Sequence, residues 1–303
     1  MVAGGCASRP GSVIIRIAPG SGAPHKALMF ALGGDDFPHD NASLIAALSS
    51  GGAKLGIGSA AITLEGSFPS LGSLRIDLTG ADLERQKRLP AMEGQGTGGF
   101  FARSLDITAT PARFANVPFQ VRLNAQDCMV MFGRAADGTR VARLEKCSSG
   151  SVEASIALAD IEAALLAFAR DAAAEHGAEV QSVRLAVEAE TPRRIALAAT
   201  AVAKAMFFTA TLTIRGRFEI DAEGNARLSD LACTGDGMIA NLAASQLRPR
   251  LAAWEGRAIP VAPLLPAGQR LLDVAITTGT TLAMRAIIGG ETHAAGAVPS
   301  PAA

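Results

Sequence analysis

The sequence has no tyrosine, a single tryptophan (Trp254) and no excess charge of either sign. Its 303 residues carry 28 Lys and Arg against 28 Asp and Glu. A protein that binds nucleic acid through phosphate contacts normally has a basic excess, and stacking surfaces for bases or sugars are built from Tyr and Trp. We therefore expect no nucleic-acid partner. Hydrophobic residues make up 49% of the chain and charged residues only 18%, which excludes an intrinsically disordered protein.

The N-terminal region lacks a recognisable targeting signal. It contains no charged stretch followed by the apolar run of about 7–15 residues that marks a secretory signal peptide. The run Ala3-Gly4-Gly5-Cys6 is faintly similar to a lipoprotein cleavage site, and a misassigned start codon would explain why nothing apolar precedes it. We therefore expect a cytoplasmic or membrane-peripheral protein, or one of the periplasm or cell envelope if translation starts upstream.

The four cysteines show no CxxC and no metal-ligand spacing with the four histidines, so we expect no metal and no other cofactor. Asp137-Gly138, between two strand-like runs, predicts a hairpin with a two-residue turn. That turn places Cys128 directly opposite Cys147. Because this register makes them a hydrogen-bonded pair, which suits a disulfide less than the neighbouring kind, two buried free thiols are the favoured interpretation. A disulfide here would indicate an oxidising compartment.

One stretch is apolar enough to suggest a membrane span. Residues 195–214 contain a single charged residue, Lys204, near their centre, and a central Lys costs about 2.5–3.5 kcal/mol on insertion. From residue 208 to residue 220, however, apolar residues alternate with polar ones, and a period of two is typical of a strand. We therefore expect two strands that meet near Lys204 rather than a spanning helix.

The sequence offers no convincing catalytic motif. Residues 94–99 match GxGxxG, but a charged loop precedes them and a strand-like run follows, whereas a dinucleotide loop needs a strand before it and a helix after it. The acidic residues Asp35, Asp36 and Asp40 are explained by a solvated loop. No GxSxG, P-loop or HExxH motif occurs. We therefore do not expect an enzyme.

The pattern along the chain predicts one folded unit with long strands and few helices. We expect a Gly- and Pro-rich extension over 1–40, an α+β domain over 41–289 and a disordered tail over 290–303. Because no βαβ alternation occurs, the fold class is α+β with a strongly curved antiparallel β-sheet around one or two amphipathic helices. Strands are expected at 13–17, 54–64, 71–78, 105–110, 119–125, 129–134, 140–145, 152–158, 180–189, 194–203, 207–220, 227–234, 271–277 and 282–288.

Three helices are expected, and the second and third have an apolar face. The first runs over 41–48 and ends at Gly51-Gly52. The second runs over 160–176, begins at Asp160, and packs through Ile161, Leu165, Phe168 and Ala172. The third runs over 238–254, contains Pro249 as a kink or break, and packs through Ile239, Leu242, Ala243, Leu247 and Leu251.

The C-terminal half carries an ordered series of features. A long strand ends in Gly216-Arg217, a turn follows at 221–225, and the next strand contains Leu228-Ser229-Asp230. A helix then leads to Ile259-Pro260 and to a closing LPxGxxLxxVxIT-like strand over 265–277. This series, residues 209–277, resembles the bacterial LmeA-like phospholipid-binding family. A more diffuse similarity extends over about 60–288.

The resemblance implies a fold similar to the tubular lipid-binding superfamily, in which a curved antiparallel sheet wraps a long helix and lipid tails lie between them. It also implies binding of anionic phospholipid in the cell envelope. We therefore expect a non-enzymatic phospholipid-binding protein or lipid carrier, with possible peripheral contact to a membrane. The residues expected to form the wall of the lipid cavity are Phe208, Leu212, Ile214, Phe218, Met238, Leu242 and Leu247.

Arginine forks match phosphate oxygens, and a lone Trp suits a membrane interface. The residues expected to contact a head group or a membrane are Arg215, Arg217, Arg248, Arg250, Arg257 and Trp254.

Two alternatives remain open from the sequence. One is a structural or adaptor domain with a filled core and no ligand. The other is an enzyme that uses polar groups of the 82–99 loop and the acidic 35–40 stretch.

Overall fold

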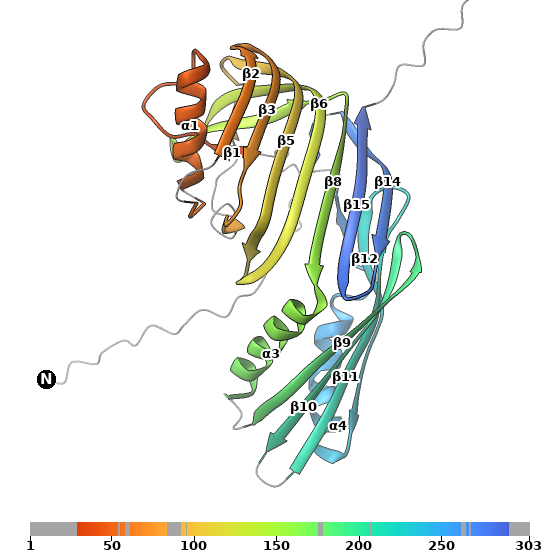
Figure 1. Cartoon of the computed structure of the whole chain (residues 1–303). Coiled ribbons are helices and arrows are strands. Elements are labelled where there is room, and N and C mark those ends of the chain that lie inside the picture. The colour runs from red at the N-terminus through yellow and green to blue at the C-terminus, as the bar shows by residue number, and fades with distance from the viewer. Residues whose placement is uncertain are drawn as a thin grey trace, which may run out of the picture.

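The computed structural model describes residues 29–53, 55–57, 61–83, 92–94, 96–174, 178–205, 208–261, 265–266 and 268–290. Within these residues the protein combines α-helices with two open, mainly antiparallel β-sheets, so the expected mixture of α and β elements is confirmed (Figure 1). The strand expected at 13–17, the helix end at 175–177 and the tail after residue 290 lie outside the described residues.

The larger sheet is built on one long hairpin. The sequence predicts three short strands where β5 and β6 form two long ones. β3 pairs with β5 in parallel, and the other pairs of this sheet are antiparallel. The ten-stranded sheet consists of β14 (Gln269–Thr277), β15 (Thr281–Gly290), β8 (Ser149–Ala157), β6 (Val117–Ala135), β5 (Gly99–Phe114), β3 (Ser70–Asp77) and β2 (Ala61–Ser67) in this order, with β7 (Arg140–Lys146), β4 (Met92–Glu93) and β1 (Met29–Ala31) attached to β6 and β7.

The helix α1 (Asn41–Ala53) packs closely against this sheet, and it runs through the two glycines that were expected to end it. A Cβ atom at Gly51 would lie 1.8 Å from the carbonyl oxygen of Ala31 in β1, so only glycine permits this approach. Asp40 caps the helix, because its Oδ1 accepts the amide of Ser43 at 2.7 Å. This close packing gives the ten-stranded sheet a filled core.

The core also contains residues that were assigned to the N-terminal extension. Leu32 is buried, and Phe37 stacks on the buried Phe132 with ring centroids 5.9 Å apart. Phe68 and Phe100 join the same aromatic cluster. β1 pairs with β7. The folded unit therefore includes residues from 29 to 40 as well.

The hairpin between β6 and β7 brings two thiols together nearly as predicted. Its turn is one residue longer than expected, since the Ala135 amide donates to the carbonyl of Thr139 at 2.8 Å. A register shift next to Met129 restores the predicted pairing of the two strands, so that Met129 pairs with Lys146. Cys128 and Cys147 occupy the next positions. Both cysteines are buried and free, which confirms the favoured interpretation of two thiols.

The smaller sheet is a five-stranded antiparallel meander. The stretch that a hydropathy window would take for a membrane span forms two of its strands, as expected. Among the described helices, none has both the length and the apolar character needed to cross a membrane. The strands in order are β13 (Ala258–Pro260), β12 (Asn225–Asp236), β11 (Phe208–Ile220), β10 (Arg194–Ala205) and β9 (Glu179–Thr191).

Two helices run along opposite edges of this sheet (Figure 1). α3 (Leu158–Ala174) contacts β9, and α4 (Met238–Ala252) contacts β12 and β11. At the β9 edge, Glu162 accepts the amide of Leu185 at 2.8 Å and Arg170 donates to the carbonyl of Val180 at 2.9 Å. The side chains of α3 thus satisfy backbone groups that an edge strand would otherwise leave unpaired.

Beyond residues 225–227, which pair with β13, the outer edge of β12 is satisfied in the same way. Arg248 of α4 donates to the carbonyl of Cys233 at 3.3 Å. The carboxylate of Glu255 accepts the amides of Asp230 and Leu231, both at 2.8 Å, where an irregularity leaves them outside the ladder. Of the kink or break expected at Pro249, the break does not occur, since the helix continues to residue 252. Each edge therefore has one arginine and one glutamate bonded to its backbone.

The two sheets meet at a second, smaller core. It contains Ile195 and Ile220 from the five-stranded sheet and Val274 and Ile276 from β14. The amide of Ile276 also donates to the carbonyl of Pro192 at 2.6 Å. This junction places α3, which follows β8 directly, between the end of the ten-stranded sheet and β9 (Figure 1).

Candidate functional site: an apolar pocket beside α3

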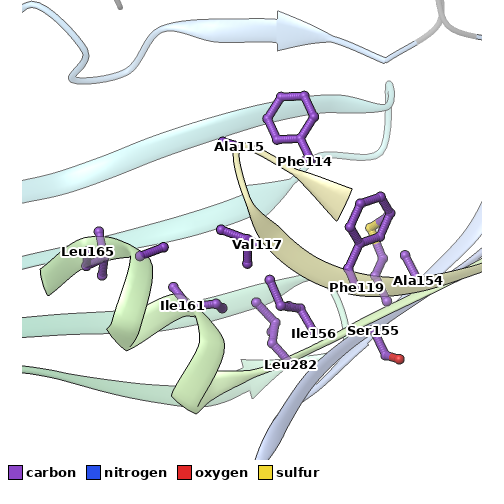
Figure 2. A pocket seen from close by; sticks show the side chains of 12 residues that line it. Phe114, Ala115, Val117, Phe119, Ala154, Ser155, Ile156, Ile161, Leu165 and Leu282 are labelled. Atoms are coloured by element: carbon purple, nitrogen blue, oxygen red, sulfur yellow. The ribbon is translucent and has the colours of Figure 1, made fainter. Parts of the chain in front are cut away.

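An apolar pocket of about 520 Å³ lies between α3 and the ten-stranded sheet. Its walls come from the tip of the β5–β6 hairpin, from β8, from β15 and from the first half of α3 (Figure 2). All but one of the lining residues are apolar. They are Phe114, Ala115, Val117, Phe119, Ala154, Ser155, Ile156, Ile161, Ala164, Leu165, Leu282 and Met284.

The hairpin tip forms one rim of the pocket because a tight turn holds it in place. Phe114 pairs with Val117, so the turn has two central residues, Ala115 and Asn116. Both adopt positive φ, 50° and 63°, as tight hairpin turns of this kind require. Phe114 remains 38% exposed at this rim, while Phe119 lies farther along β6 and packs against the main core.

The opposite wall is an apolar stripe on α3. Ile161 and Leu165 line the pocket, and Phe168, one helical turn farther on, is 70% exposed. This stripe was expected to be the packing face of the helix. Instead, α3 meets β9 through the face that carries Glu162 and Arg170, and none of its residues is fully buried. The stripe is therefore left to form the pocket wall and its continuation.

The interior of the pocket offers no polar partner. Ser155 contributes its lone polar side chain, and Figure 2 shows the Ser155 hydroxyl pointing away from the other lining side chains. Binding pockets for small molecules typically span about 300–1,000 Å³ and are mostly apolar. The pocket thus has the size of a ligand site and a chemistry that suits hydrocarbon.

The structure does not assemble the cavity wall that was expected between β11 and α4. Leu212, Ile214 and Phe218 share one face of β11 and are half-buried. None of the three lines the pocket. Met238 is 88% exposed and Leu242 63% exposed, on the side of α4 away from the sheet. Leu247 is half-buried, and the side chain of Phe208 lies outside the described residues.

Met238 and Leu242 face outward because α4 approaches β12 closely. Ala240 and Ala244 are fully buried, so these small residues form the packing face. A Cβ atom at Gly235 would lie 2.2 Å from the carbonyl carbon of Ala240, so a glycine is needed at the contact. With small residues facing the sheet, the larger Met238 and Leu242 are turned to the outside.

The residues expected to bind a head group do not gather at the pocket. Arg215 and Arg217 lie on the face of β11 opposite to Leu212 and Ile214, as the strand alternation requires. Arg217 is held by the carboxylates of Glu190 and Asp230.

The remaining candidates lie on or after α4. Arg248 bonds the β12 backbone, and Arg250 is exposed in the last helical turn. Trp254 lies in the turn after the helix, half-buried, with the guanidinium carbon of Arg257 over its ring at 5.1 Å from the centroid. None of the six expected head-group residues lines the apolar pocket.

A second hollow lies on the outer face of the five-stranded sheet. Its floor is made of small residues such as Ala196 and Ala198, and its walls carry Arg215, Arg217 and Glu188 among other charged residues. Hydrogen bonds to Glu190 and Asp230 raise the pKa of Arg217. The charges in this hollow are therefore partly satisfied by one another.

The acidic and glycine-rich segments considered from the sequence have structural roles. Hydrogen bonds from Ser43 lower the pKa of Asp40, which acts as the cap of α1. Gly96 and Gly98 lie along β6, and the segment leads into the strand β5, as expected. Among the described residues, no three His, Cys, Asp or Glu side chains are grouped closely enough to hold a metal ion.

Most of the pocket residues were not singled out from the sequence. Ile161 and Leu165 were recognised as an apolar stripe, but their role was assigned to packing. Phe114 and Val117 flank the two-residue turn Ala115-Asn116, and its one turn signal, Asn116, is weaker than the Asp-Gly pair that marked the next hairpin. The alternation of apolar and polar residues along 119–125 and 282–288 predicts which residues face inward. It does not predict which strands end near α3.

Comparisons with protein-family models, with curated proteins and with solved structures find no match for this chain. The resemblance noted in the sequence is therefore neither supported nor contradicted by them.

Proposed function

We propose that this protein binds the acyl chain of a phospholipid or another lipid in the pocket beside α3, without catalysing a reaction. The observation that carries the proposal is the pocket itself. It has a volume of about 520 Å³ and an apolar lining, Phe114 is exposed at its rim, and Phe168 is exposed on α3 one turn beyond the lining residue Leu165. An exposed apolar surface of this kind usually marks a binding site.

The energetics of hydrocarbon burial support this proposal. Each methylene group taken out of water contributes about 0.8 kcal/mol. A 16-carbon chain therefore offers on the order of 12 kcal/mol before the entropic costs of binding are subtracted. A pocket of this size needs no polar contact to hold an acyl chain.

The arrangement of sheets and helices also suits a lipid-binding protein of the tubular kind. The pocket lies between a helix and a sheet, and the family resemblance would put lipid tails between elements of these two kinds. In this proposal the ten-stranded sheet and α3 hold the lipid, in place of β11 and α4. The LmeA-like assignment and the cell-envelope location belong to the same proposal.

A docking domain for another protein is the second candidate function. It is favoured by Met238 and Leu242, two large apolar side chains on the outer face of α4. Met238 and Leu242 lie one helical turn apart, and a contiguous apolar patch on a surface is typical of a protein contact. In that case lipid would not bind the pocket, and a partner protein would bind α4.

Substitution of Leu165 by arginine tests the proposal. Leu165→Arg places a charge in the apolar pocket, and we expect the affinity for a fluorescent fatty-acid probe to fall at least tenfold. Leu242→Arg is the matched control, since Leu242 lies on the outer face of the other helix. Unchanged circular dichroism of both variants would show that they fold. Equal probe binding by folded Leu165→Arg and wild type would refute the pocket assignment.

A further inference from the structure

We infer that the pocket accepts a single hydrocarbon chain and selects ligands by the length of that chain, while the head group stays outside. This inference rests on the proposed function and specifies its ligand. The shared chemistry is one unbranched acyl chain, which a free fatty acid, a monoacyl lipid or one tail of a diacyl lipid can each supply.

The volume of the pocket limits it to one chain. A methylene group takes up about as much space as a water molecule, roughly 30 Å³. A pocket of 520 Å³ thus has room for roughly 17 methylene groups at that volume each. Two chains of ordinary length would need about twice this space, so a second tail has to remain outside.

The lining gives the pocket no means to recognise a polar group. No charged side chain lines it, and the hydroxyl of Ser155 points away from the interior (Figure 2). A hydroxyl, amide or charge inside would lose its hydrogen bonds to water without gaining others. The ligand segment inside the pocket must therefore be hydrocarbon, and the head group must lie at or beyond the rim.

The part of the pocket wall on β6 and β15 is fixed by both hydrophobic cores. Phe119 packs against the core of the ten-stranded sheet, and Leu282 and Met284 pack against the core at the junction of the two sheets. These three side chains cannot move apart without disturbing those cores. Phe114 stays exposed at the rim. A chain that fills the space bounded by these side chains gains nothing further by being longer.

Two neighbouring alanines on α3 provide a matched test. Ala164 lines the pocket, whereas Ala163 is exposed on the same helix. Ala164→Leu adds three carbons to the pocket wall, and Ala163→Leu adds the same three carbons to the surface. Both substitutions keep a strong helix former, so a difference between them reports on the pocket.

The measurement is the dissociation constant of saturated fatty acids and lysophosphatidylcholines, with chains from about 8 to about 20 carbons, for the full chain. Burial of one more methylene is expected to improve affinity about fourfold until the pocket is filled, after which affinity levels off. Fatty acid and lysophosphatidylcholine of equal chain length should bind alike. Ala164→Leu should move the levelling point about three carbons shorter, and Ala163→Leu should leave it in place.

The outcomes separate this inference from the proposed function. If acyl ligands bind but Ala164→Leu leaves the levelling point unchanged, or if head groups change affinity more than tenfold at equal chain length, the inference is wrong and lipid binding stands. The inference is also wrong if a diacyl lipid binds much more tightly than the monoacyl lipid with the same chain. Such a gain in affinity would mean that the second chain is buried too. If no acyl ligand binds the wild type, the proposed function itself fails.

Discussion

Cys128 and Cys147 show how burial decides the chemistry of single residues in this protein. The two thiols lie at neighbouring positions of the β6–β7 hairpin and are both buried and free. Burial raises the pKa of Cys128 to about 12, with further contributions from Cys147 and Asp127, and burial also raises the pKa of Cys147. Because the thiolate is the reactive form, neither thiol is poised for reaction in the folded protein.

The raised pKa of Cys128 predicts a specific pH dependence of stability. The unfolded thiol titrates near its ordinary pKa of 9.0, so above that pH the unfolded state binds fewer protons than the folded state. The free energy of unfolding should fall as the pH rises from 9 towards 12, with a slope of up to about 1.4 kcal/mol per pH unit from this thiol. Urea titrations at several pH values measure the slope.

Cys128→Ala is the control for this prediction, since it removes the titrating group and keeps a small apolar side chain. Its stability should decline less steeply above pH 9 than that of the wild type. Rapid alkylation of Cys128 in the native protein at pH 8, before unfolding, would contradict the account of this thiol.

At the scale of elements, α3 and α4 act as covers for the two edges of the five-stranded sheet. An edge strand exposes unpaired amide and carbonyl groups, which invite pairing with other chains. Here Glu162 and Arg170 bond the β9 edge, and Arg248 and Glu255 bond the β12 edge. Arg248, which the sequence suggested as a head-group residue, thus has a structural role at the β12 edge.

Removal of the Glu162 carboxylate tests the cover at β9. Glu162→Ala leaves the amide of Leu185 without its acceptor, and we expect this amide to exchange with deuterium at least tenfold faster. Stability should fall by about 1 kcal/mol, the usual net value of one hydrogen bond. Glu162→Gln keeps an acceptor oxygen and should restore most of the protection. Unchanged exchange at Leu185 in Glu162→Ala would show that the contact does not protect the edge.

The elements themselves were largely predictable, whereas their packing faces were not. Period-two alternation correctly gave β10 and β11 in place of a membrane span, and the Asp137-Gly138 signal gave the β6–β7 hairpin. For α4, however, hydrophobic size pointed to Leu242, while the buried face carries Ala240. A sequence pattern ranks residues by hydrophobicity, but close packing on a glycine such as Gly235 favours the smallest residues.

At the scale of the whole molecule, the pocket depends on contacts between distant parts of the chain. Its walls come from residues around 115, 155, 165 and 283, and these meet because β8 runs directly into α3 while β15 pairs with β8. Local sequence patterns do not predict which of these distant segments come into contact. The sequence therefore led to a lipid-binding hypothesis and to one wall of the pocket, but it expected a cavity between β11 and α4, whereas the apolar pocket lies beside α3.

The central claim is that lipid occupies this pocket, and native mass spectrometry of the purified full-length protein tests it most directly. Organic extraction and lipid identification follow on the same sample. We predict a co-purified acyl lipid at close to one per chain, which is lost in Leu165→Arg and retained in Leu242→Arg. A bare protein mass for the wild type, with no lipid gained after incubation with phospholipid vesicles or fatty acid, would contradict the account and favour a docking domain.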